Sequence, residues 1–125
     1  MSPALLLAVS LAGGLGALLR LVLDALIRRR TPGTFPWATW VINLTGSALL
    51  GLLTGLTVNG LLPPPYEVVA GTGFLGGYTT FSTASYETVR LARDRRYAAA
   101  MANCFGMLVL GVAGAAAGLV VGLAV

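Results

Sequence analysis

Long stretches without any charged residue constrain the fold of this chain more than any other feature of its sequence. No Lys, Arg, Asp or Glu occurs in residues 1–19, 31–66, 68–86 and 97–125. A helix needs about 20 mainly apolar residues to cross the hydrocarbon core of a bilayer, and each of these stretches approaches or exceeds that length. Because 57% of the 125 residues are hydrophobic and 10% are charged, we expect one transmembrane domain over residues 1–125, without a separate soluble domain.

Pro, Gly and charged residues divide this domain into four expected helices. The helices cover about residues 4–29, 36–59, 66–92 and 97–123. Neither Pro nor Gly continues a helix well, which places connections at Thr31-Pro32-Gly33 and at the run of prolines that ends at Pro65. Four helices of this length make a thin bundle around a polar path, so we also expect an oligomer.

Glycines recur at every fourth position in two of these helices. They are Gly51 and Gly55 in the second helix and Gly114, Gly118 and Gly122 in the fourth. This spacing lets helix backbones approach closely in lipid. The stripes fit packing within one chain and packing between two chains equally well.

The arginines predict the orientation of the helices in the membrane. Seven of the eight lie in or beside the first and third connections, and the second connection and both ends of the chain carry none. The seven are Arg28, Arg29, Arg30, Arg90, Arg93, Arg95 and Arg96. With four spans these two connections lie on one side, which the positive-inside rule assigns to the cytoplasm. We therefore expect a multi-pass protein of the plasma (inner) membrane with cytoplasmic Arg-rich loops.

Polar positions also lie within the first two expected helices. Arg20 and Asp24 are four residues apart in the first, where they either pair with each other or leave Arg20 free to draw anions into a water-filled vestibule. Asn43 lies in the otherwise apolar second helix. Its amide either joins helices as a hydrogen-bonding group or replaces water around an anion.

The third expected helix carries the strongest functional pattern. Between Gly71 and Ser85, four glycines precede a run of Ser and Thr that is interrupted by aromatic residues. Glycine weakens a helix and hydroxyl groups can satisfy freed backbone groups, so this pattern indicates a helix broken in mid-membrane. Such a break exposes carbonyls that bind cations and amides that bind anions, whereas a kink that only serves packing binds neither.

Acidic residues are scarce in this chain, and catalytic groups are scarcer. Glu87, one helical turn beyond Thr83, is either a surface carboxylate that reaches toward water or a polar neighbour of the same path. The chain has no His and one Cys, Cys104. We therefore expect no enzymatic activity, since no set of nucleophile, base or metal ligands lies at membrane depth.

Motifs at these positions resemble the Fluc/CrcB fluoride channels, a family of small four-helix proteins that export fluoride passively. The motifs are Gly13-Gly14-x-Gly16-Ala17-x-x-Arg20, Val41-x-Asn43-x-x-Gly46-Ser47-x-x-x-Gly51, Gly73-Phe74-x-Gly76-Gly77-x-Thr79-Thr80-Phe81-Ser82-Thr83, and Glu87. The third is the most specific, and the order and spacing of the motifs agree with the family over most of the chain. The resemblance implies a fluoride-selective channel that lowers fluoride toxicity and assembles as an antiparallel dimer with two narrow ion paths.

The resemblance also implies roles for individual residues. Main-chain carbonyls of Gly76 and Thr79, two from each subunit, would hold a structural Na⁺ at the dimer centre. Asn43 and the edge of the Phe81 ring would contact fluoride, because a pore must replace the water around this ion with hydrogen-bond donors and positive ring edges. The rest of the expected set comprises Thr80, Ser82 and Thr83 along the fluoride path, and Arg20 and Glu87 as vestibule or supporting groups.

Ala84 and Met107 depart from the family pattern. Ala84 stands where the family usually has a second phenylalanine, and Met107 stands where it commonly has a serine. The chain therefore lacks half of a paired-phenylalanine constriction and one polar group of its path. Both changes favour an alternative function, a weakly conducting or non-conducting accessory subunit.

The identity of the partner subunit stays open at the level of sequence. The connections expected on one side of the membrane carry seven arginines and those on the other side carry none, which favours a single orientation. An antiparallel homodimer needs both orientations. A heterodimer with an oppositely oriented paralogue therefore competes with a homodimer. A small multidrug-type antiporter has the same size and topology, but it needs a carboxylate near the middle of its first helix, and Asp24 lies near the end.

Overall fold

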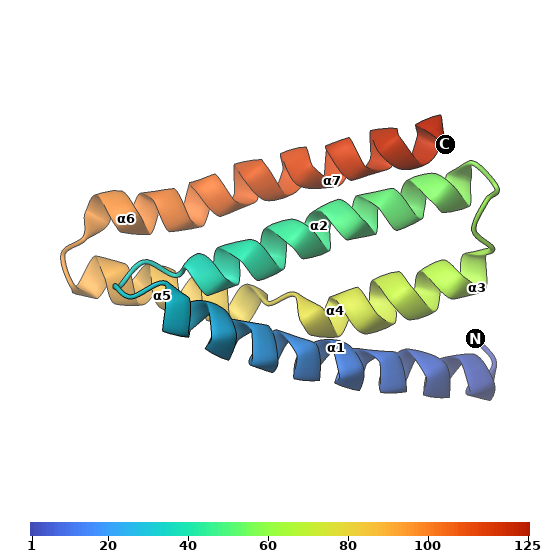
Figure 1. Cartoon of the computed structure of the whole chain (residues 1–125), viewed down its shortest axis with the longest axis horizontal. Helices are drawn as coiled ribbons and strands as arrows, with labels where there is room; N and C mark the ends of the chain where they lie inside the picture. The colour runs from blue at the N-terminus through green and yellow to red at the C-terminus, as the bar shows by residue number, and fades with distance from the viewer.

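The chain folds into four helical segments that lie side by side and alternate in direction (Figure 1), in a computed structural model that describes residues 1–125. The first segment is α1 (Pro3–Arg30) and the second is α2 (Trp37–Val58). The third segment comprises α3 (Pro64–Glu67), η1 (Val68–Leu75), α4 (Gly76–Tyr78) and α5 (Phe81–Arg93). The fourth segment comprises α6 (Tyr97–Met101), η2 (Ala102–Gly106) and α7 (Met107–Ala124). The η stretches are π-helical, with wider turns that are hydrogen-bonded from residue i to i+5.

Local chemistry sets several helix ends. The Ser2 Oγ accepts a hydrogen bond from the Leu5 N–H at 3.2 Å, and Pro3 lies in the first turn of α1, where its missing N–H leaves no carbonyl unpaired. Gly33 and Gly60 follow α1 and α2 with φ of +128° and +78°. Residues with a side chain rarely adopt a backbone conformation with positive φ. Glycine adopts it readily and so allows the chain to turn back at these two positions.

The structure confirms the all-α class and the interruption of the third helix. α1, α2 and the continuous helix Tyr97–Ala124 are each long and apolar enough to cross a membrane. The third segment was expected as one broken span over residues 66–92. In the structure its first part ends at Tyr78 and α5 begins at Phe81, so the interruption falls at Thr79 and Thr80.

Glycines allow α2 and α7 to pack at close range. A Cβ atom on Gly51 would overlap the Ala115 carbonyl, and one on Gly118 would overlap the Ala48 carbonyl. Gly55 and Gly122 likewise approach each other's backbone, with Gly122 Cα 2.8 Å from a Cβ built on Gly55. These four glycines therefore serve packing within the chain, which decides between the two readings of the stripes.

α1 packs against the first half of the third segment through a second set of glycines. A Cβ on Gly16 would overlap the Phe74 carbonyl, and one on Gly77 would overlap the Gly13 carbonyl. Gly16 is also the only buried residue of α1. Backbone therefore lies directly on backbone here, which fixes the position of η1 and α4 just before the interruption.

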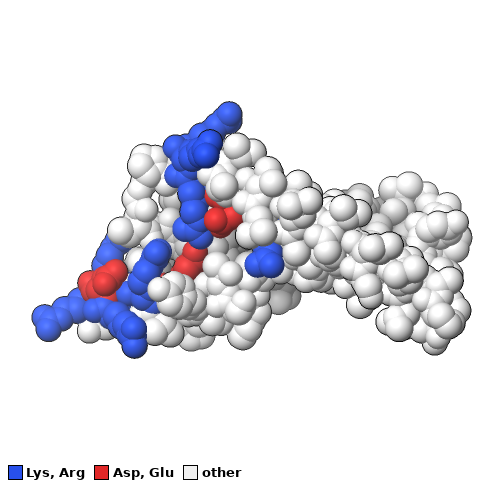
Figure 2. Space-filling view, turned by 90° about the horizontal axis from the view of Figure 1, so that it is seen from below, with Lys and Arg blue, Asp and Glu red and all other residues white.

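Charged side chains gather toward one end of the molecule on the face that Figure 2 shows, whereas the other end is uncharged on that face. The charged end is the one at which α1 is joined to α2 and α5 to α6 (Figure 1). An uncharged body with charges at one end suits a bundle that lies in lipid with its basic connections at one membrane surface.

Candidate functional site

Two residues of extended backbone interrupt the third segment, and we call them the break. Thr79 has φ −79° and ψ 162°, and Thr80 has φ −147° and ψ 122°. Thr80 also caps α5, because its Oγ1 accepts a hydrogen bond from the Thr83 N–H at 3.2 Å. A Thr at this position favours the start of a new helix. The glycines that precede the break let α4 lie against α1 up to that point.

The break leaves main-chain carbonyls without their usual helical partners, and those of Gly76 and Thr79 are among them. In a continuous helix the Thr80 N–H would bond to the Gly76 carbonyl, but it donates to Asn43 Oδ1 at 2.8 Å instead. The Thr83 N–H would bond to the Thr79 carbonyl, but it donates to the Thr80 Oγ1. Gly76 and Thr79 therefore each present a carbonyl oxygen that can accept a hydrogen bond or bind a cation.

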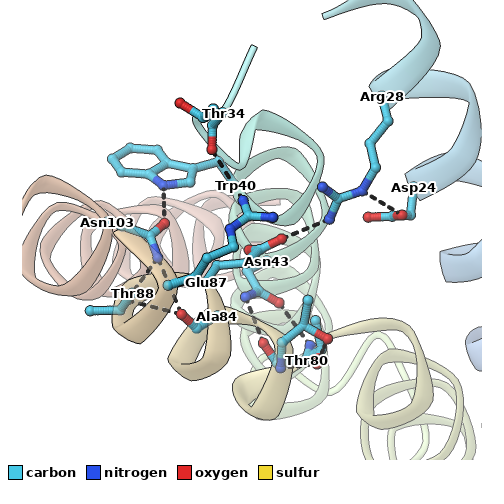
Figure 3. A network of polar contacts seen from close by, with 12 residues as sticks. Asp24, Arg28, Thr34, Trp40, Asn43, Thr80, Ala84, Glu87, Thr88 and Asn103 are labelled. Atoms are coloured by element: carbon cyan, nitrogen blue, oxygen red, sulfur yellow. Dashed lines mark hydrogen bonds and ion pairs between the residues drawn. The ribbon is translucent and has the colours of Figure 1, made fainter. Parts of the chain in front are cut away.

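Asn43 of α2 bonds to both polar groups of the Thr80 backbone (Figure 3). Its Oδ1 accepts from the Thr80 N–H and its Nδ2 donates to the Thr80 carbonyl, both at 2.8 Å. The Nδ2 also donates to the Met107 sulfur at 3.2 Å. The Asn43 side chain thus replaces the helical hydrogen bonds that the Thr80 backbone lacks. Its amide also joins the second, third and fourth segments, as expected of an interhelical hydrogen-bonding group.

A groove with a volume of about 930 Å³ runs beside the break and is lined by α2 and by both the third and fourth segments. Five of the expected site residues line this groove, namely Asn43, Gly76, Thr79, Thr80 and Phe81. The Phe81 ring is 88% exposed, so its edge is free to meet an ion or a partner. The structure thus brings together the residues expected to bind the cation and the residues expected to contact the anion.

Ala84 and Met107, the positions that depart from the family pattern, line the same groove. Met107 is buried, and its sulfur accepts the hydrogen bond from Asn43. A thioether is a weak acceptor, so the contact is weaker than the one a hydroxyl would make. Ala84 leaves space where a second aromatic ring would stand.

Ser82 and Thr83 lie outside the groove. Ser82 is exposed, and Thr83 is half-buried with its hydroxyl accepting from the Thr80 hydroxyl at 3.0 Å. In a single chain these two side chains support the first turn of α5.

Asp24 pairs with Arg28 and not with Arg20, so the Arg20–Asp24 pair considered from the sequence is wrong. The Arg28 Nε donates to Asp24 Oδ2 at 2.8 Å. Both pairs have the spacing i, i+4, but an acid that precedes its base is the better arrangement on a helix. Arg20 is half-buried, its Nε has no hydrogen-bond partner, and it does not line the groove.

Glu87 is 2% exposed, which excludes a carboxylate that reaches toward water. The Arg28 Nη2 donates to its Oε1 at 2.7 Å, and its Oε2 is buried without a partner (Figure 3). Arg28 therefore connects α1 to α5 through Glu87, while Asp24 on its own helix holds the guanidinium in place. From the sequence only Arg20 was considered as a partner for Asp24, and no signal pointed to the contact between Arg28 and Glu87, which lies 59 residues away.

Replacement of Arg28 by leucine is expected to destabilise the protein by about 1–3 kcal/mol, less than for a fully buried pair because Arg28 is partly exposed. The physical reason is that Glu87 would be left buried and unpaired. Thermal unfolding in detergent, followed by circular dichroism, measures this effect. Arg29→Leu removes an exposed arginine one position along and serves as the control. An equal melting temperature for the two variants would contradict the role assigned to Arg28.

Asn103 is a buried polar residue whose role the sequence did not reveal. It lies in η2, is 1% exposed and accepts from the Trp40 Nε1–H at 2.8 Å. Its Nδ2 donates to the Thr88 hydroxyl at 2.8 Å and to the Ala84 carbonyl at 3.2 Å (Figure 3). Asn103 thus holds α5 against α2 and the fourth segment. The one signal for this role in the sequence was the position of a polar residue, Asn103, within an otherwise apolar segment.

The chain is similar to known proteins over most of its length. The family model described as "CrcB-like protein, Camphor Resistance (CrcB)" matches residues 7–119. "Fluoride-specific ion channel FluC 1" of Leifsonia xyli subsp. xyli is 54% identical over 122 residues, which cover 98% of this chain and 89% of the relative. "Fluoride-specific ion channel FluC 2" of Mycobacterium tuberculosis H37Rv is 46% identical over 118 residues, which cover 94% and 90%. "Fluoride-specific ion channel FluC 3" of Bifidobacterium longum is 43% identical over 113 residues, which cover 90% and 93%.

Proposed function

This chain belongs to the CrcB-like family, and from that membership we propose that it is a fluoride-selective passive ion channel of the plasma (inner) membrane. It exports fluoride from the cytoplasm and so lowers fluoride toxicity. It is an ion channel and not an enzyme. The observation that supports this function most directly is the break, where backbone groups, an aromatic ring and an amide meet beside one groove.

A Na⁺ ion held at the break is part of this proposal. Oxygen atoms are the ligands that hard cations prefer, and the carbonyls of Gly76 and Thr79 lack helical partners. Two carbonyls from each of two antiparallel subunits would surround one ion at the dimer centre. The bound cation would supply positive charge near the anion path and satisfy carbonyls that otherwise stay unpaired in lipid.

The fluoride path of the proposal runs past Phe81 and Asn43. An aromatic ring is positive at its edge, so the exposed edge of Phe81 can stand in for a water molecule around an anion. Asn43 has both ends of its amide engaged by the Thr80 backbone. We therefore assign Asn43 the task of holding the break open, with fluoride meeting the N–H that otherwise donates to the weakly accepting Met107 sulfur. The hydroxyls of Thr80, Ser82 and Thr83 continue the path.

Arg20 and Glu87 support the path from outside the groove. Arg20 makes no ion pair with a carboxylate, and a positive charge there favours anions in the vestibule. Glu87 fixes α5 through Arg28. The Arg-rich connections lie in the cytoplasm by the positive-inside rule.

An accessory subunit is the second candidate function, because Ala84 and Met107 both line the groove. In that case the chain pairs with an oppositely oriented paralogue whose path conducts better. We do not retain the antiporter alternative, since Asp24, the only acid of the first span, lies near its end and is paired with Arg28.

Fluoride efflux from liposomes that contain only this chain is the decisive experiment, measured with a fluoride electrode. Loss of the Phe81 ring edge in Phe81→Ala is expected to remove about 1 kcal/mol of anion stabilisation, which corresponds to roughly fivefold slower efflux. Phe105→Ala removes a second exposed ring that does not line the groove and should leave efflux unchanged. Absence of fluoride efflux from this chain alone and in mixtures with a paralogue would contradict a conducting role.

A further inference from the structure

Tyr78, the last residue of α4 before the break, makes a hydrogen bond to α2 that the ion path does not explain. Its side chain is 5% exposed, and its hydroxyl lies 2.9 Å from the Thr45 hydroxyl. The single hydrogen of the Thr45 hydroxyl points to main-chain carbonyls of its own helix, with Val41 O at 2.6 Å and Ile42 O at 3.1 Å. The Tyr78 hydroxyl is therefore the donor in the bond between the two side chains.

Gly46 of α2 is buried directly against the break. A Cβ atom on Gly46 would overlap the Thr79 methyl group and would lie 3.3 Å from Tyr78 Cδ1. The Thr79 side chain cannot turn away without losing a bond, because its hydroxyl donates to the Leu75 carbonyl at 2.9 Å. The missing side chain of Gly46 therefore lets the break lie directly on α2.

Thr45, Gly46 and Asn43 together form one face of α2, which we call the support face. At 3.6 residues per turn, Gly46 lies between the other two around the helix, about 100° from Thr45 and about 60° from Asn43. Tyr78 bonds to one edge of the support face and Thr80 bonds to the other, while the residue between them crosses its middle. Hydrogen bonds to α2 therefore hold the chain on both sides of the point where it crosses this helix.

Tyr78 lies between two residues whose carbonyls lack helical partners, Gly76 and Thr79. These carbonyls belong to or adjoin α4, which has only three residues. α4 packs on the backbone of α1 at Gly77 and bonds to α2 through Tyr78. A packing contact alone lets so short a helix rotate about its axis, whereas a directional hydrogen bond fixes the rotation. The direction of both carbonyls therefore depends on the bond that Tyr78 makes.

We infer that the hydroxyl pair of Tyr78 and Thr45 positions the carbonyls next to the break, and so sets how tightly the break holds Na⁺. The inference deepens the proposed function and rests on its cation site. Neither Tyr78 nor Thr45 lines the groove, so the pair acts through the main chain and not by contact with an ion. Both are therefore positioning residues, and their loss weakens Na⁺ binding without removing any of its proposed ligands.

The response of the melting temperature to Na⁺ tests this inference. The protein is purified in detergent with N-methylglucamine in place of Na⁺ and is melted over a Na⁺ titration, since a ligand of the folded state raises its stability. Thr45→Val and Tyr78→Phe are each expected to raise the Na⁺ concentration at half-maximal stabilisation roughly fivefold, as expected for the loss of one hydrogen bond. The double variant should match the single ones, because all three lack the same bond. Thr45→Ser keeps the hydroxyl and should respond like the unmodified chain.

Thr57→Val is the matched control. The Thr57 hydroxyl also donates to a carbonyl four residues back in α2, that of Leu53 at 3.0 Å, but it has no partner in the third segment. This variant should keep the Na⁺ midpoint of the unmodified chain. Thr45 is exposed, so Thr45→Val keeps the packing of the bundle and carries the test even if Tyr78→Phe does not fold.

Three outcomes would overturn the inference. They are an unchanged Na⁺ midpoint in Thr45→Val, an equal shift in Thr57→Val, and a melting temperature of the unmodified chain that does not respond to Na⁺. A hydroxyl pair that only stabilised the fold would lower the melting temperature at every Na⁺ concentration and leave the midpoint in place. Fluoride efflux from liposomes decides the proposed function separately, because a chain that conducts fluoride without any response to Na⁺ keeps the channel function and loses this inference.

Discussion

Asn43→Ala is expected to slow fluoride efflux roughly tenfold or more, because it leaves both polar groups of the Thr80 backbone unpaired at the break. Each unpaired buried group costs about 1–3 kcal/mol, and 1.4 kcal/mol corresponds to a factor of ten in an equilibrium constant. The freed Thr80 N–H can then return to the Gly76 carbonyl, which continues the helix and removes the proposed cation ligand. The same change should lower the melting temperature in detergent.

The two readouts separate a positioning role of Asn43 from a direct role in ion contact. A side chain that only met the ion would slow efflux without changing the melting temperature. A side chain that holds the break should lower both. Asn59→Ala provides the control, since Asn59 is exposed and lies just beyond α2. An Asn43→Ala protein that melts like the unmodified chain would contradict the geometry at the break.

Gly16→Ala is expected to destabilise the bundle by about 1–3 kcal/mol, the usual cost of overpacking. A Cβ at Gly16 overlaps the Phe74 carbonyl and lies 2.9 Å from the Tyr78 nitrogen, so it meets backbone that cannot rotate away. α1 must then move off η1 and α4, which shifts the carbonyls next to the break. We expect both a lower melting temperature and slower fluoride efflux.

Gly14→Ala is the matched control for this experiment. Gly14 lies two residues away in the same helix, and a Cβ there meets nothing within 4 Å. Alanine also favours a helix over glycine, so this variant should be as stable as the unmodified chain or slightly more stable. If the two variants melted at the same temperature, the close backbone contact between α1 and the third segment would be wrong.

Much of the architecture could be predicted from short-range patterns. The charge-free stretches indicated the helices, because each charged residue placed in lipid adds its own energetic cost. The glycines before Thr79 and the hydroxyl residues after it indicated the broken third helix. These properties follow from the identity of neighbouring residues, so no knowledge of the packing was needed.

The pairing of polar groups could not be predicted in the same way. Asn43 was a candidate for either helix joining or ion contact, and only its distance to Thr80 showed that both ends of the amide are engaged. The sequence allowed Asp24 to pair with Arg20. In the structure Asp24 pairs with Arg28, which also pairs with Glu87 on α5, because one guanidinium can bond to two carboxylates.

The four uncharged stretches determined, by themselves, that this chain belongs in a membrane as a bundle of helices. The motif from Gly73 to Thr83 determined where one helix breaks. Only the tertiary structure decided which groups meet there: the N–H groups that would close the helix at Gly76 and Thr79 bond to side chains instead. The reason is physical. Hydrophobic spans and helix breaks depend on residues close in sequence, whereas hydrogen-bond partners depend on which residues the packing of glycine-lined backbones brings together.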